Sequence, residues 1–158
     1  MEPFEFEVLT AEDDNKAVEF CRKIYAEMGW TEETLGTSIL DAFSEPGDVF
    51  VVVKQDGEII GTYGLQRLSD TETVLKKFYL AKNARGSGIA ARMFEDALKR
   101  ARELGYTTLV LDVSTNNERA VSFYQKMNME EFVVIPHPRW WESSPEGQKT
   151  HRYFRMRL

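Results

Sequence analysis

The sequence predicts an α/β (α+β) fold in which a mixed, mostly antiparallel central sheet of about seven strands carries helices on both faces. Two strand-like runs at residues 48–54 and 58–68 flank an Asp-Gly pair, which is typical of the turn of an antiparallel hairpin. Two later runs at residues 73–81 and 106–113 are separated by a long amphipathic helix, which is typical of a parallel β-α-β crossover. With 158 residues and an ordinary composition, the chain is expected to form one domain, residues 1–158.

The periodicity of the apolar side chains predicts the order β-α-α-β-β-β-α-β-α-β-β. The expected strands are residues 4–9, 48–54, 58–68, 73–81, 106–113, 129–135 and 152–158. The expected helices are residues 10–28, 31–43, 89–104 and 117–127. Thr10 with Asp13 forms a capping pattern for the first helix, which Gly29 ends, and Asn116 or Asn117 caps the last one. The third helix has one apolar stripe, which consists of Ile89, Met93, Phe94, Ala97, Leu98, Ala101 and Leu104.

The composition indicates a protein of the cytoplasm. No window approaches the roughly 18 consecutive apolar residues that a membrane span needs, so no membrane partner is expected. The acidic, strand-like start of the chain does not have the pattern of a secretory signal. The one cysteine, Cys21, falls on an apolar helix face, which favours a buried structural thiol and fits a reducing compartment.

Charge is distributed unevenly along the chain. Residues 1–75 carry 5 basic and 17 acidic side chains, a net charge of −12, whereas residues 76–102 carry 8 basic and 2 acidic side chains, a net charge of +6. In the positive segment, Lys82, Arg85 and Arg92 flank the expected start of a helix, where cations oppose the helix dipole unless an anion binds. The acidic remainder lacks a basic stripe interleaved with aromatic residues, which argues against a nucleic-acid partner.

A glycine turn joins the strand at residues 73–81 to the third helix. Unpaired backbone amides and the helix dipole make such a turn an anion site, and glycine lets the backbone approach a phosphate closely. The turn resembles the acyl-CoA diphosphate loop of the GNAT superfamily of N-acyltransferases, whose pattern Arg/Gln-x-x-Gly-x-Gly/Ala falls here on Arg85, Gly88 and Ala90. The resemblance implies that CoA binds to Arg85, Gly86, Ser87, Gly88, Ile89 and Ala90.

A second signature of the same family, Asn-x-x-Ala-x-x-x-Tyr, falls on Asn117, Ala120 and Tyr124. The family usually has Gly-Phe where this chain has Asn128-Met129, and Asn tolerates the left-handed conformation of a helix C-cap. The resemblance implies that Asn117 contacts the CoA arm and that Tyr124 lies beside the thioester sulfur. A phenol with a pKa near ~10 can donate a proton to the departing thiolate while it stays protonated at neutral pH.

The order of the elements is similar to that of the GNAT fold over nearly the whole chain. This resemblance implies that the two central strands splay apart and that the pantetheine arm pairs with the strand edge at Phe78, Tyr79 and Leu80. A backbone amide near Leu80 would then meet the charge that develops on the carbonyl oxygen. The implied activity is transfer of an acetyl group from acetyl-CoA to a primary amine of a small molecule or peptide. The resemblance implies no metal, and it leaves a homodimer open.

The general base and the acceptor are less well defined. Glu72 occupies a place where some members of the family carry a base, and His137, His151 or a water chain are the alternatives. Three tryptophans are candidates either for an aromatic wall of the acceptor site or for core packing or a dimer contact: Trp30, Trp140 and Trp141. The acidic first half of the chain suggests a cationic acceptor, such as a polyamine, an aminoglycoside-like amine or a peptide N-terminus.

Two other classes of function compete with this interpretation. Residues 86–91 also fit Gly-x-Gly-x-x-Ala, and Asp112 falls near the place of a ribose-binding acid, so an NAD(P)-linked oxidoreductase is an alternative. Three observations weaken the oxidoreductase alternative. Residues 82–86 separate the strand from the turn, one β-α-β unit is expected, and the earlier strands form hairpins. The second alternative is a non-catalytic acyl-CoA-binding module, against which the presence of Tyr124 argues. No Lys-Ser/Thr follows the glycines, which excludes an NTPase phosphate loop.

Overall fold

The structure of the protein is a computed structural model that describes residues 3–31 and 35–158. Its strands are β1 (Glu5–Val8), β2 (Val49–Gln55), β3 (Glu58–Arg67), β4 (Glu72–Leu80), β5 (Thr108–Ser114), β6 (Glu130–Glu131) and β7 (His151–Arg157). Its helices are α1 (Asp14–Met28), α2 (Ile39–Ala42), α3 (Ile89–Glu103) and α4 (Glu118–Lys126). None of the described helices is both long and apolar enough to cross a bilayer.

The strands form one sheet in the order β1-β2-β3-β4-β5-β7-β6. Antiparallel pairs join β1 to β2, β2 to β3, β5 to β7 and β6 to β7. β4 and β5 pair in parallel on either side of α3 in the sequence, so the predicted crossover is confirmed. The predicted α/β fold with a mixed, mostly antiparallel sheet and the predicted order of elements are also confirmed.

The chain divides into two compact units. The first comprises Met1–Gln66 and Lys76–Ala97, and the second comprises Arg67–Leu75 and Leu98–Leu158. Strand β4 and helix α3 therefore contribute residues to both units. The single domain expected from the sequence stays a prediction.

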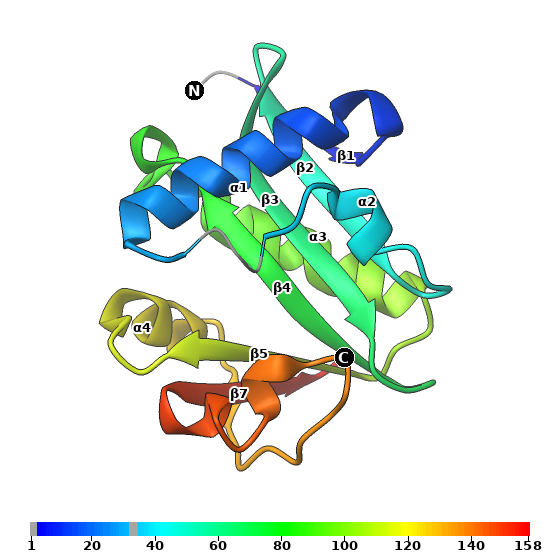
Figure 1. Ribbon diagram of the computed structural model, residues 1–158, viewed down its shortest axis with the longest axis vertical. Coiled ribbons are helices and arrows are strands. Elements are labelled where there is room, and N and C mark those ends of the chain that lie inside the picture. Colours follow the sequence, from blue (N-terminus) through cyan, green and yellow to red (C-terminus); the bar gives the residue numbers. More distant parts are fainter. Residues whose placement is uncertain (1–2, 32–34) are drawn as a thin grey trace. The chain divides into compact units, whose positions relative to one another are not determined.

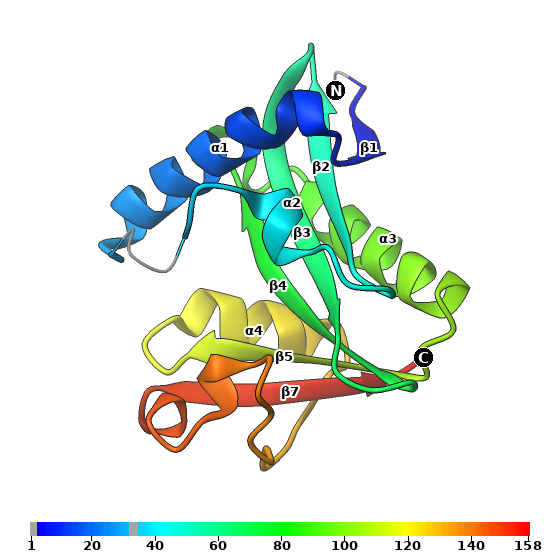
Figure 2. The ribbon, with the colours of Figure 1, turned by 45° about the vertical axis from the view of Figure 1, so that its right-hand side comes forward.

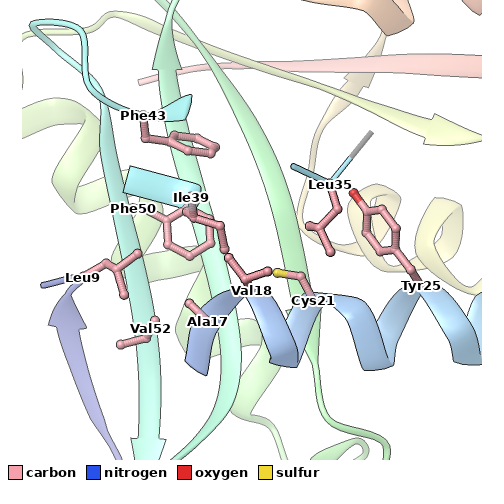
Figure 3. Packing of buried hydrophobic residues seen from close by; sticks show 10 residues of the cluster. All are labelled: Leu9, Ala17, Val18, Cys21, Tyr25, Leu35, Ile39, Phe43, Phe50 and Val52. Carbon is pink, nitrogen blue, oxygen red and sulfur yellow. The ribbon is translucent and has the colours of Figure 1, made fainter. Parts of the chain in front are cut away.

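In the first unit, helices lie on both faces of the strands (Figures 1 and 2). α1 and α2 cover one face through a buried cluster, shown in Figure 3, that consists of Leu9, Ala17, Val18, Cys21, Tyr25, Leu35, Ile39, Phe43, Phe50 and Val52. On the other face, Val53 and Leu80 pack against Ile89 and Met93 of α3. Val52 and Val53 belong to different clusters because successive side chains of a strand point to opposite faces.

The turns of this unit follow the sequence signals closely. Asp56 and Gly57 have φ angles of 53° and 76°, as a two-residue hairpin turn requires, so the predicted β2–β3 hairpin is confirmed. Gly29 ends α1 with a φ of 74°, and its backbone N–H donates to the Ala26 carbonyl, as predicted for the stop of the first helix.

The start of α1 differs from the prediction. Thr10 makes no side-chain capping hydrogen bond, and a 3-10 turn over Ala11–Asp13 precedes the helix. Asp13 instead accepts a hydrogen bond from the ammonium of Lys54, at 2.6 Å. The predicted capping of the first helix by Thr10 and Asp13 was therefore wrong. The Asp13 carboxylate binds Lys54 of β2, which lies 41 residues away in the sequence.

The second helix is much shorter than the expected residues 31–43, of which residues 32–34 lie outside the described part of the chain. α2 begins only at Ile39, where the Asp14 carboxylate accepts from the backbone amides of Ile39 at 3.0 Å and Leu40 at 3.1 Å. The Ser38 hydroxyl caps the same turn by accepting from Asp41. A carboxylate from another helix thus fixes the start of α2, and periodicity along the chain does not contain that information.

In the second unit, β5 and β7 pair over seven residues, from Thr108 opposite Arg157 to Ser114 opposite His151. α4 packs on one side of this ribbon, where the rings of Tyr124 and Phe154 lie 6.5 Å apart. A cluster around Trp140 and Tyr153 covers Val110 and Val74. In the described parallel pairing of β4 with β5, Glu72–Val74 lie opposite Thr108–Val110. Pairing at this end of the strands agrees with the prediction that the two central strands splay apart.

Two expectations for the second unit were wrong. The strand predicted over residues 129–135 is reduced to Glu130–Glu131, and Val133 and Ile135 beyond it are 91% and 84% exposed. These apolar residues have the composition of a strand but pair with no described neighbour. Leu104, predicted on the buried stripe of the third helix, is 45% exposed because α3 ends at Glu103.

Candidate active site

The loop between β4 and α3 carries the glycine turn predicted as an anion site. After β4, a 3-10 turn over Lys82–Ala84 is followed by Arg85 in an extended conformation. Gly86 and Gly88 then adopt φ angles of 80° and 84°. α3 begins at the next residue, Ile89. The structure thus places a strand, a glycine turn and a helix N-terminus in the predicted order.

Gly86 and Gly88 are needed for their backbone conformation and not for lack of space. Both φ angles lie in the left-handed region that a side chain disfavours, yet a Cβ atom at either position would meet no atom within 4 Å. The space beside the turn is therefore open to a ligand. The first amides of α3 lack a carbonyl four residues earlier within the helix, so they are able to donate to an anion in that space.

Arg85 is held in place by two contacts. Its Nε atom donates to the Leu80 carbonyl at 3.0 Å, and its Nη1 atom lies 2.7 Å from Oε1 of Glu27 near the end of α1. The Arg85 and Glu27 side chains are 24% and 30% exposed, so the pair is partly shielded from solvent. Glu27 could not be identified as a partner of Arg85 from the sequence, because the contact joins positions 58 residues apart.

The three residues predicted to pair with the pantetheine arm belong to the last part of β4. The ring of Phe78 lies 6.3 Å from that of Phe94 on α3, and Leu80 packs against Ile89. Tyr79 points to the opposite face, where its ring lies 6.0 Å from that of Tyr25 on α1. The side chains of Phe78, Tyr79 and Leu80 are thus used in packing, and their pairing with the pantetheine arm stays a prediction.

β4 is irregular just before these residues. Lys77 has a φ of 50°, which is rare for a residue with a side chain and is strained in the middle of a strand. The Thr62 hydroxyl donates to the carbonyl of Lys77 at 2.8 Å and so holds this kink. A periodic sequence pattern predicts a regular strand here and does not show the kink.

Tyr124 lies on α4 in the second unit and is buried. Burial raises the pKa of its hydroxyl, and the negative charge of Asp112 raises it further. Asn117 caps this helix, because its Oδ1 atom accepts from the Ala120 amide at 3.2 Å. The predicted cap is confirmed, whereas the predicted contact of Asn117 with CoA stays a prediction. Asn128 follows α4 with a φ of 66°, as predicted for the left-handed C-cap.

The candidates for the general base lie in the second unit. Glu72 is the first residue of β4, and its carbonyl accepts from the amides of Leu68 and Ser69 in the preceding turn. His137 has a structural environment, because Nε2 lies 2.8 Å from the Leu68 carbonyl and Nδ1 accepts from the Arg139 amide. The role of Glu72 as a base stays a prediction.

The remaining histidine also contacts groups of its own unit. Nδ1 of His151 lies 2.9 Å from the Gly147 carbonyl, and Nε2 lies 4.0 Å from Asp112. A ring nitrogen next to a carbonyl oxygen carries its proton, so Nδ1 is the donor of this pair. These contacts suffice to explain His151 as a structural residue.

The three tryptophans have different environments. Trp30 follows α1, is 38% exposed, and its ring lies 5.5 Å from that of Tyr25. Trp140 is 2% exposed, and its indole N–H donates to Asp112 at 2.6 Å, so it belongs to the core of the second unit. Trp141 is 63% exposed. Core packing is therefore the role of Trp140, and Trp30 is the tryptophan that presents an aromatic surface beside β4.

The chain is similar in sequence and structure to known acetyltransferases. The model of the acetyltransferase (GNAT) family matches residues 15–129. The Escherichia coli (strain K12) protein named uncharacterized N-acetyltransferase YjgM is 29% identical over 132 residues, which are 77% of this chain and 79% of that protein. A GNAT-family acetyltransferase from Staphylococcus aureus Mu50 matches 99% of both chains at 19% identity with a TM-score of 0.82. A GNAT-family acetyltransferase from Elizabethkingia anophelis, solved with acetyl-CoA bound, matches 100% of both chains at 16% identity with a TM-score of 0.66.

Proposed function

Because the chain belongs to the acetyltransferase (GNAT) family, we propose that it transfers an acetyl group from acetyl-CoA to a primary amine of a small molecule or peptide. The observation that carries the proposal is the open glycine turn between β4 and α3, at Gly86 and Gly88. The diphosphate of CoA would accept hydrogen bonds from the amides of residues 86–90, where the helix dipole favours negative charge. Arg85 would add a positive charge beside the same loop.

The pantetheine arm would extend from this turn along the backbone of β4. Its amide groups would pair with the strand at Phe78, Tyr79 and Leu80, as a peptide adds to a sheet edge. The proposal is supported by the position of these residues at the end of β4, directly before the loop that carries the glycine turn.

In the proposed reaction, the unprotonated amine attacks the carbonyl carbon of the thioester, and a new C–N bond forms. The C–S bond then breaks, and the sulfur leaves as a thiolate that takes a proton from the Tyr124 hydroxyl. The amine loses its extra proton to Glu72 or to water, and Tyr124 is reprotonated from solvent. The products are the N-acetylated amine and CoA. A backbone N–H near Leu80 would stabilise the oxyanion of the tetrahedral intermediate.

A thermal-shift experiment tests the cofactor. Acetyl-CoA and CoA are expected to raise the melting temperature of the protein, because a ligand that binds the folded state stabilises it, whereas NAD and NADP should not. Stabilisation by the dinucleotides without stabilisation by CoA would overturn the proposal. The mostly antiparallel sheet already disfavours the oxidoreductase alternative.

A further inference from the structure

Three aromatic rings and one lysine form a cluster on the α1 face of the first unit, which we call the Lys77 cluster. Its members are Tyr25 on α1, Trp30 just after α1, and Lys77 and Tyr79 on β4. The ring centroids lie 5.5 Å apart for Tyr25 and Trp30, 6.0 Å for Tyr25 and Tyr79, and 6.1 Å for Trp30 and Tyr79. Trp30 is 38% exposed, and Lys77 and Tyr79 are half-buried, so the cluster is partly open to solvent.

The ammonium of Lys77 is the charged group of the cluster, and it has unused donors. Its Nζ atom donates to the Tyr25 hydroxyl at 2.9 Å and lies 5.2 Å from the centre of the Tyr25 ring. Among the residues that the structure describes, no carboxylate lies within 4.0 Å of this ammonium. By contrast, Lys54 of β2 contacts both Asp13 and Glu7. A lysine in a partly buried position without an acidic partner is a ready site for an anion.

The Tyr25 hydroxyl adds a second donor next to the first. Because it accepts the hydrogen bond from Lys77, its own proton remains for another acceptor. Figure 3 shows the Tyr25 ring standing away from α1 with the hydroxyl at its far end. Two donors 2.9 Å apart match the two oxygens of a carboxylate, which accepts two parallel hydrogen bonds well.

The backbone of β4 sets the position of the lysine. The kink at Lys77 is strained, and the Thr62 hydroxyl holds its carbonyl. Strained backbone persists where the surroundings enforce it, and it concentrates at ligand sites. Lys77 also directly precedes Phe78, so a group bound to Lys77 would lie beside the strand proposed to pair with pantetheine.

We propose that the Lys77 cluster binds the carboxylate of the acetyl acceptor, so that the acceptor is an amino acid or an amino-acid-like amine. The inference rests on the proposed function and names its substrate class. Lys77 and Tyr25 donate to the carboxylate, and Trp30 and Tyr79 pack against the apolar part of the substrate. The acidic first half of the chain suggested a cationic acceptor, but a purely cationic one would be repelled by the Lys77 ammonium. A zwitterionic acceptor satisfies both, because its ammonium suits the acidic surroundings and its carboxylate suits Lys77.

The test compares pairs of acceptors that share an amine and a side chain. The twenty L-amino acids and their C-terminal amides are assayed with acetyl-CoA by detection of the released thiol, for wild type, Lys77→Met, Lys77→Arg and the exposed control Lys99→Met. We expect Lys77→Met to reduce the ratio of kcat/KM for acid over amide about 10- to 100-fold, mainly through KM. Lys77→Arg should restore part of the ratio, and Lys99→Met should leave it unchanged.

The amines of an amino acid and of its amide differ in basicity. Comparing the acid-to-amide ratio of kcat/KM between variants cancels this difference, because it is the same for every variant. A ratio that is the same in wild type and Lys77→Met would overturn the inference. Acetylation of amines that lack a carboxylate, with no acid–amide difference in wild type, would also overturn it while the proposed function stands.

A binding measurement separates this inference from the proposed function. Phenylacetate and phenylacetamide are titrated into the protein, and the indole ¹H–¹⁵N signal of Trp30, assigned with Trp30→Phe, is followed by NMR. Phenylacetate should shift this signal in wild type and not in Lys77→Met, and phenylacetamide should shift it much less. Equal shifts by both probes would refute the carboxylate site. Absence of CoA binding, measured separately by thermal shift, would instead refute the proposed function.

Discussion

At the scale of single residues, burial changes the chemistry of Tyr124. Its ring packs 6.5 Å from that of Phe154, and both burial and the charge of Asp112 raise the pKa of the hydroxyl. A phenol in this environment strongly prefers its neutral form. It therefore keeps its proton at neutral pH and can donate a hydrogen bond to the leaving sulfur, while the raised pKa makes it a weaker acid than a free tyrosine.

Replacement of Tyr124 by Phe tests this role. Tyr124→Phe should lower kcat about 100-fold or more, because general acid catalysis typically contributes at least that much, and should change the dissociation constant of CoA less than about twofold. Stopped-flow thiol detection and calorimetry measure the two quantities.

Tyr153→Phe is the matched control, since Tyr153 is a buried tyrosine of the same unit that donates to the Glu142 carbonyl. It should lower stability by about 1 kcal/mol and preserve kcat. An unchanged kcat in Tyr124→Phe would remove the proposed acid.

The same burial predicts the pH dependence. Because the folded-state pKa of Tyr124 is raised, the neutral hydroxyl persists to a higher pH than that of a free tyrosine. The kcat of the wild type should therefore show no decrease from loss of this proton up to about pH 10. A pH profile of kcat measures this, with Tyr124→Phe as the reference. A basic limb below pH ~10 that is present in wild type and absent in the variant would contradict the assignment.

At the scale of elements, the sequence was sufficient wherever local chemistry decides the structure. The Asp56-Gly57 turn, the Gly29 stop and the Asn117 cap are signals within a few residues, and each was confirmed. The start of α2 was missed because the Asp14 carboxylate from another helix decides it.

The same distinction applies to the candidate site. The glycine turn and Tyr124 belong to contiguous motifs and could be found from the sequence. The contact of Glu27 with Arg85 and that of Tyr25 with Lys77 join positions 58 and 52 residues apart. No spacing rule within one element connects such positions, so these partners required the folded structure.

Two glycines with the same backbone strain separate stability from ligand binding. Gly88 and Gly57 have φ angles of 84° and 76°, and neither would place a Cβ within 4 Å of another atom. Gly88→Ala and Gly57→Ala should each lower the free energy of unfolding by about 1–2 kcal/mol, because both force a side chain into the left-handed region. Only Gly88→Ala should also weaken CoA binding, since its Cβ enters the proposed phosphate space. Chemical denaturation and calorimetry measure both effects. Wild-type CoA affinity in Gly88→Ala would place the diphosphate elsewhere.

At the scale of the whole molecule, charge is concentrated where the ligand is expected. The segment of residues 76–102 has a net charge of +6 in a chain with a net charge of −6. Attraction between this segment and a polyanion is screened by salt, more strongly where the charges are exposed. Within it, the contact of Arg85 with Glu27 neutralises part of the charge beside the glycine turn.

This arrangement predicts opposite effects for the two partners of that ion pair. Glu27→Gln should tighten CoA binding, because it removes a negative charge that competes with the diphosphate for Arg85. Arg85→Gln should weaken binding and reduce its dependence on salt. Titrations between about 0.05 and 0.5 M NaCl measure both changes. Lys99→Met, a charge change at an exposed position of α3, is the control. Equal salt dependence in wild type and Arg85→Gln would show that Arg85 does not face the anion.

The buried position of Cys21 has a practical consequence for enzymology. It is the chain's one cysteine, and burial raises the pKa of its thiol to about 11. At pH 8 roughly one molecule in a thousand would carry the reactive thiolate, and that sulfur is enclosed by the α1 core. Chromogenic disulfide reagents should therefore react with the product of each turnover and leave the folded polypeptide unlabelled, so that background colour stays low even at high protein concentration.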